Sequence, residues 1–171
     1  MIRYNYIKQQ ITNTQKYFFI KSYPVDVLNI INQIPCCKIF SFFEFSKLNN
    51  AKVSDIFSMC QSQTGCTFYH KTAKKYLMLY NDDLTPGRIR WTLAHELGHI
   101  LLRHFLSEGI TEFQKEKEAD LYAQQLLAPF EYFQIYNITN PISLMNFFGL
   151  SHEAALNTML QYNKWKSNNN T

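Results

Sequence analysis

Apolar positions in the second half of the chain recur at helical spacing. One set that lies on a single helical face comprises Ile89, Leu93, Leu97 and Leu101. Thr85 is a suitable N-cap and Pro86 suits the first helical position. The pattern therefore predicts a helix from residue 85 to about residue 103.

A second helical pattern follows. Thr111 and Gln114 fit a capping box, and Pro129 follows the last apolar position. The apolar face between them consists of Ala119, Tyr122, Ala123, Leu126 and Leu127. Two shorter helices are predicted over 141–148 and 151–165, separated by Gly149.

The first half of the chain predicts mostly strands. A helix is expected over 24–35, and aromatic and apolar residues over 38–45 predict a strand. Residues 67–70 and 76–80 are two further strand candidates, joined by a polar hairpin. The pattern indicates an α+β fold, a small antiparallel or mixed sheet followed by a helical half, in one domain over 1–171. Residues 1–20 are expected to be a flexible extension, and 167–171 a flexible polar tail.

Composition supports a folded chain. Hydrophobic residues make up 46% of the 171 residues and charged residues 18%, so disorder is not expected. The sequence has neither an apolar stretch long enough to span a membrane nor the apolar centre of a signal peptide, which favours a cytoplasmic location without membrane partners. The thiols of Cys36, Cys37, Cys60 and Cys66 are accordingly expected to stay reduced.

Charge is unevenly distributed along the chain. Residues 1–75 contain ten Lys or Arg against three Asp or Glu, and residues 76–171 contain seven against ten. A basic half can attract nucleic acid. The basic residues are scattered rather than clustered, which favours an ordinary solvated surface, so direct nucleic-acid binding is not expected.

The most specific chemistry lies in the segment His95-Glu96-Leu97-Gly98-His99. Four residues along a helix correspond to ~40° of rotation and ~6 Å of rise, so both imidazoles project from one face. Such a pair can bind one Zn²⁺, and Glu96 would then act as general base and acid toward a zinc-activated water. Gly98 in mid-helix indicates close backbone packing or room for a ligand.

A catalytic zinc needs a third protein ligand, and the following helix offers candidates. We predict Glu116 as that ligand and Asp120, four residues on, as a hydrogen-bond acceptor for a ligand histidine. Glu118 lies on another face and is the alternative ligand. His104, five residues after His99, is predicted to face away and not to be a ligand.

Residues 88–102, 116–129 and 147–155 resemble corresponding segments of the ImmA/IrrE metallopeptidase family. The resemblance covers about residues 24 to 162 and implies a thermolysin-like, zincin-like zinc core. It also implies cleavage of a helix-turn-helix repressor encoded nearby on a phage or mobile element, which would switch genes on. Small departures from the family pattern are Asp120 for Asn, Tyr122 for Phe and Ala128 for Met.

Other functions remain open at the level of sequence. The helix-Gly149-helix ending superficially resembles a helix-turn-helix, which would suit a DNA-binding regulator. Its second helix carries few basic residues, which is weak support for phosphate contacts. A metal-sensing regulator without proteolytic activity is a further alternative to the zinc endopeptidase.

Overall fold

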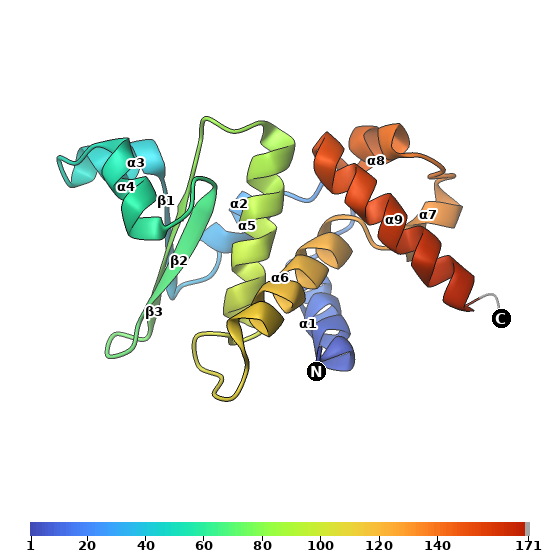
Figure 1. Cartoon of the computed structure of the whole chain (residues 1–171), viewed down its shortest axis with the longest axis horizontal. Coiled ribbons are helices and arrows are strands. Elements are labelled where there is room, and N and C mark those ends of the chain that lie inside the picture. Colours follow the sequence, from blue (N-terminus) through green and yellow to red (C-terminus); the bar gives the residue numbers. More distant parts are fainter. Residues whose placement is uncertain (170–171) are drawn as a thin grey trace.

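A computed structural model describes residues 1–169 of the chain (Figure 1). The helices are α1 (Tyr4–Tyr17), α2 (Val27–Asn32), α3 (Phe42–Leu48), α4 (Val53–Cys60), α5 (Pro86–Leu101), α6 (Glu112–Leu127), α7 (Glu131–Ile135), α8 (Pro141–Phe148) and α9 (His152–Asn169). The strands are β1 (Cys37–Ser41), β2 (Gly65–His70) and β3 (Lys75–Tyr80). The fold is α+β, as predicted.

The sheet is mixed and has the strand order β1-β3-β2. Met78 of the central strand pairs with Ile39 in the parallel direction and with Thr67 in the antiparallel direction. The predicted hairpin is therefore confirmed. One edge of β2 faces away from β3, toward the region that α5 occupies in Figure 1.

The predicted strand over 38–45 is too long. It ends at Ser41, whose hydroxyl accepts a hydrogen bond from the backbone N–H of Glu44 while the Glu44 carboxylate accepts one from the N–H of Ser41. This capping box starts α3 and turns the aromatic run into a helix. The helix predicted over 24–35 is likewise shorter, because Asp26 caps it at its start and it ends at Asn32.

Helices α5 and α6 form the centre of the molecule and pack closely against each other (Figure 1). A Cβ at Gly98 would lie 3.1 Å from Tyr122 Cδ1 and 3.3 Å from Ala119 Cα. A larger residue here would force Tyr122 or Ala119 to shift by a few tenths of an ångström, so glycine favours this close approach. Of the two expectations drawn from its mid-helix position, this is the close packing. The predicted helices over 85–103, 111–129, 141–148 and 151–165 correspond to α5, α6, α8 and α9.

The N-terminal segment differs from the flexible extension that we expected. Residues 4–17 form α1, which buries Ile7 and Ile11 and packs on α6. The hydroxyls of Thr14 and Tyr122 lie 2.9 Å apart and join the two helices. At the other end α9 continues to Asn169, and the last two residues of the predicted tail lie outside the described residues. Within residues 1–169 no helix combines the length and apolar character of a membrane span.

Candidate metal centre

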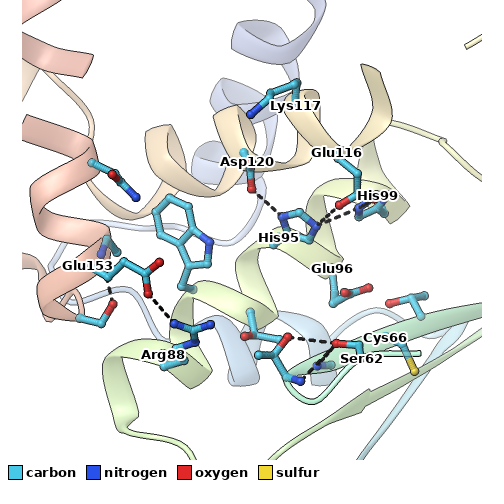
Figure 2. Close-up of a pocket in the computed structure, with 18 of the residues that line it drawn as sticks. Ser62, Cys66, Arg88, His95, Glu96, His99, Glu116, Lys117, Asp120 and Glu153 are labelled. Atoms are coloured by element: carbon cyan, nitrogen blue, oxygen red, sulfur yellow. Dashed lines mark hydrogen bonds and ion pairs between the residues drawn. The ribbon is translucent and has the colours of Figure 1, made fainter. Parts of the chain in front are cut away.

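Helix α5 carries His95 and His99 one turn apart on the face toward α6 (Figure 2). Their Nε2 atoms lie 3.0 Å from each other. The His95 and His99 side chains are only 17% and 11% exposed, so little water competes for these nitrogens. Both rings therefore direct the same nitrogen toward one point.

Glu116 reaches this point from α6. Its Oε2 lies 3.3 Å from His95 Nε2 and its Oε1 lies 3.4 Å from His99 Nε2. One ligand atom from each of the three residues falls within 4.8 Å of the others. The carboxylate is about half exposed, which leaves the outer side of the group open.

The separations fit a zinc ion. Ligand atoms ~2.05 Å from a tetrahedral metal lie about 3.3 Å from each other. The observed separations of 3.0, 3.3 and 3.4 Å agree with that value. Two imidazoles and one carboxylate are also a donor set used by catalytic zinc. The residues present therefore fit the metal that the sequence predicted.

Asp120 lies one turn after Glu116 and contacts the other nitrogen of His95, with Oδ1 3.1 Å from Nδ1. Burial disfavours the charged imidazole, but hydrogen bonds to Asp120 and Glu116 outweigh it and raise the pKa of His95 to about 9. Burial and the neighbouring charge of His95 lower the pKa of His99 to about 4.

Glu96 belongs to the same helix but lies beside the triangle rather than in it (Figure 2). Burial raises the pKa of its carboxyl group, and the Thr67 hydroxyl and the charge of His95 partly oppose that rise. A carboxyl group with a raised pKa exchanges protons more readily near neutral pH. Glu96 is thus placed to move a proton next to the three ligand atoms.

The triangle opens into a cavity of about 1070 Å³. Strand β2, α5, α6 and α9 all contribute to its wall, with Cys66, Thr67, His95, Glu96, Glu116 and Asn157 among the lining residues. A salt bridge of 2.6 Å between Arg88 and Glu153 joins α5 to α9 at this wall. The cavity is large enough to bury several residues of a peptide.

Comparison with known protein families identifies the family of this chain. The model of the IrrE N-terminal-like domain, peptidase family M78, matches residues 54–160. The chain belongs to this family. The match confirms the resemblance to ImmA/IrrE metallopeptidases and covers α5, α6 and the first half of α9.

One solved structure supports the fold alone. A "Mycobacterium tuberculosis transcriptional regulator" is similar with a TM-score of 0.55 and 14% sequence identity. The similarity covers 90% of this chain and 46% of that protein, so this chain spans about half of its length. No match is found among curated proteins.

Glu118, the alternative ligand, does not join the triangle of this M78-family chain. Its carboxylate is fully buried and binds Arg3 and His104 instead. Burial alone would raise the pKa of Glu118, but hydrogen bonds from Arg3 and Gln114 lower it to about 2. Residues 116 and 118 project in different directions from a helix, which explains why Glu118 lies away from the histidine pair that Glu116 contacts.

The prediction for His104 was wrong in one respect. His104 is buried, and its Nδ1 lies 3.1 Å from Nδ1 of the ligand candidate His99. The prediction assumed that the helix continues to residue 104, which would turn the His104 ring away from His99. In the structure α5 ends at Leu101, and Arg103 adopts a left-handed φ of 59°. The backbone therefore turns after α5 and brings the His104 ring against the His99 ring.

The expectation of four reduced thiols was also wrong for two of them. Cys60 and Cys66 form a disulfide, with their Cα atoms 5.5 Å apart, between the end of α4 and β2. Both residues line the cavity. Cys36 and Cys37 are free, and burial raises the pKa of the Cys37 thiol to about 12.

Proposed function

We propose that the chain is a zinc-dependent endopeptidase that uses His95, His99 and Glu116 as metal ligands. The observation that supports this most strongly is the convergence of three ligand atoms at tetrahedral spacing beside a large cavity. Membership of the M78 peptidase family supports hydrolysis of a peptide bond. Zinc, when bound there, supplies a Lewis acid that polarises the scissile carbonyl group and makes water more acidic.

Glu96 performs the proton transfers in this proposal. Its carboxylate takes a proton from the water whose oxygen bonds to the carbonyl carbon, and returns that proton to the amine nitrogen as the C–N bond breaks. The raised pKa of Glu96 suits both directions of transfer. Asp120 accepts a hydrogen bond from His95 Nδ1 and so orients its Nε2 toward the metal.

The edge of β2 supplies a surface for the substrate. Edge strands carry unpaired backbone N–H and C=O groups that pair with an extended peptide. Cys66 and Thr67 of β2 line the same cavity as His95 and Glu96. A peptide that adds to this edge would therefore lie beside the metal ligands.

The substrate that we propose is a helix-turn-helix transcriptional repressor encoded close to this protein on a phage or mobile element. We propose that the cleavage takes place in the cytoplasm. Support comes from the family resemblance. The similar solved structure bears the name of a transcriptional regulator, and this name adds support for a role in gene control.

A DNA-binding role for α8 and α9 has less support. The start of α9 packs on α5, where a Cβ at Gly87 would lie 2.6 Å from Ser151 N. Glu153 in the first turn adds a negative charge and pairs with Arg88. A recognition helix would need this end free and basic.

The test replaces Glu96 by Gln and incubates the zinc-loaded protein with the neighbouring repressor. We expect E96Q to retain zinc and to cleave about 100- to 10,000-fold more slowly, the contribution of general acid–base catalysis. E108Q, which changes an exposed glutamate in the loop after α5, serves as the matched control and should cleave normally. Cleavage by E96Q at the wild-type rate would contradict the proposal.

A further inference from the structure

A chain of buried and partly buried polar contacts leads from Arg3, near the N-terminus, to the candidate metal ligand His99. Arg3 donates from its backbone N–H to Glu118 Oε1 at 3.0 Å and from Nε to Oε2 at 2.9 Å. The same Glu118 Oε2 lies 3.2 Å from His104 Nε2. His104 Nδ1 in turn lies 3.1 Å from His99 Nδ1. The His104 and Glu118 side chains are 1% and 0% exposed, so this contact is sealed from water.

Proton positions along this chain follow from what each group can do. An ionised carboxylate only accepts hydrogen bonds, so His104 must donate to Glu118 from Nε2. Arg3 already balances the charge of Glu118, and full burial disfavours a charged imidazole, so His104 is a neutral imidazole. A neutral imidazole has one N–H, and Nδ1 of His104 is therefore an acceptor.

The acceptor on His104 fixes the tautomer of His99. The atom that faces it is Nδ1 of His99, which must then carry the hydrogen. Nε2 of a neutral His99 is consequently left with a free lone pair. This is the nitrogen that lies 3.0 Å from His95 Nε2 and 3.4 Å from Glu116 Oε1.

We propose that His104, Glu118 and Arg3 are positioning residues that hold His99 in its Nδ1–H tautomer with Nε2 directed at the metal. The inference rests on the metal site of the proposed function. His95 obtains the same orientation from a single carboxylate, Asp120. Among residues 1–169, Nδ1 of His99 contacts no carboxylate but Nδ1 of His104, which transmits the effect of Glu118 to it.

The first measurement uses the metal-free wild-type protein, so it needs neither a variant nor catalysis. Long-range ¹H–¹⁵N correlation NMR of the histidine side chains reports which nitrogen carries the hydrogen. We expect Nδ1–H for His99 and Nε2–H for His104. A hydrogen on Nε2 of neutral His99 would overturn the proposal.

The second measurement is zinc affinity, by competition with a chelator, in two variants of His104. H104L removes the acceptor, and we expect affinity to fall about 10- to 100-fold, as for other outer-shell partners of metal ligands. H104N places a side-chain oxygen near the position of Nδ1, so it should retain most of the wild-type affinity. Circular dichroism of both metal-free variants establishes that they are folded.

The outcomes separate this inference from the proposed function. Equal zinc affinity for wild type and H104L, or equal losses in H104L and H104N, would overturn the positioning role. A wild-type protein that binds zinc but cleaves no repressor would contradict the endopeptidase and leave the predicted tautomer and affinities standing.

Discussion

His95 and His99 are neighbours on one helical face but differ in charge. Burial disfavours a proton on either ring, yet Asp120 and Glu116 reverse this for His95 and raise its pKa to about 9, whereas the pKa of His99 falls to about 4. Without metal, the pair therefore carries one positive charge at neutral pH, on His95, whose imidazolium ring holds one proton more than the neutral ring of His99. Zinc must displace that proton, because a ligand imidazole is deprotonated at the metal-bound nitrogen.

Replacing Glu116 by Ala tests the third ligand at the scale of one residue. The change removes both an oxygen of the triangle and the carboxylate that contacts His95 Nε2 and His99 Nε2. We expect zinc affinity to fall at least about 100-fold, the upper end of the effect of an outer-shell residue. Chelator competition measures it, with E108A as an exposed control. An unchanged affinity in E116A would remove Glu116 from the site.

At the scale of elements, the spacing between α5 and α6 determines whether Glu116 reaches the histidines. Gly98 permits this spacing because it has no side chain, whereas a Cβ at this position would press against Tyr122 and Ala119. Both neighbours are fully buried and have little room to move.

Replacing Gly98 by Ala tests this packing. Alanine gains ~1 kcal/mol in a helix interior, but overpacking a core costs ~1–3 kcal/mol. We expect a net loss of about 1 kcal/mol in the free energy of unfolding, together with weaker zinc binding. Urea denaturation of the metal-free protein measures the first. A variant stabilised by the full helix-propensity gain would show that the two helices are not in close contact here.

The sequence predicted the elements whose start and end signals agree with their apolar period. Helix α8 begins at Pro141 and ends before Gly149 as expected, and α6 begins after Thr111. Elements were missed where a local signal competed with composition. The Ser41–Glu44 capping box was hidden in an aromatic run that resembles a strand, and Ile7 and Ile11, spaced for a helix, lie in a polar segment.

The candidate site could likewise be predicted where its residues lie in regular helices, and not where they lie outside them. Helical spacing places His95 and His99 on one face of α5 and Glu116 and Asp120 on one face of α6, and the packing of the two helices brings these faces together. His104 lies beyond a left-handed residue, where that geometry no longer applies. The contact of Arg3 with Glu118 joins residues 115 positions apart, which no local pattern reveals.

At the scale of the whole molecule, this ion pair ties the start of α1 to α6. Its carboxylate is held in the charged form, since the pKa of Glu118 is about 2 in the folded protein and near 4.5 when unpaired. A depressed folded pKa gives stability that is complete above the unfolded value. That stability is lost as the pH falls from about 4.5 to about 2.

Replacing Glu118 by Gln should remove this part of the pH dependence. We expect E118Q to be less stable than wild type at pH 7, by about 3 kcal/mol, and the difference to shrink as the pH falls below about 4.5. Urea unfolding of the metal-free proteins across this range measures it. E108Q should follow the wild-type curve, and a constant gap between E118Q and wild type would contradict the ion pair.

The central claim is that one zinc ion binds between α5 and α6. Anomalous diffraction at the zinc absorption edge, from crystals of the zinc-loaded protein, locates the ion directly. We predict a single strong peak per chain, ~2.0–2.2 Å from His95 Nε2, His99 Nε2 and a Glu116 oxygen. A protein that takes up no zinc, or a peak away from these three atoms, would contradict the account.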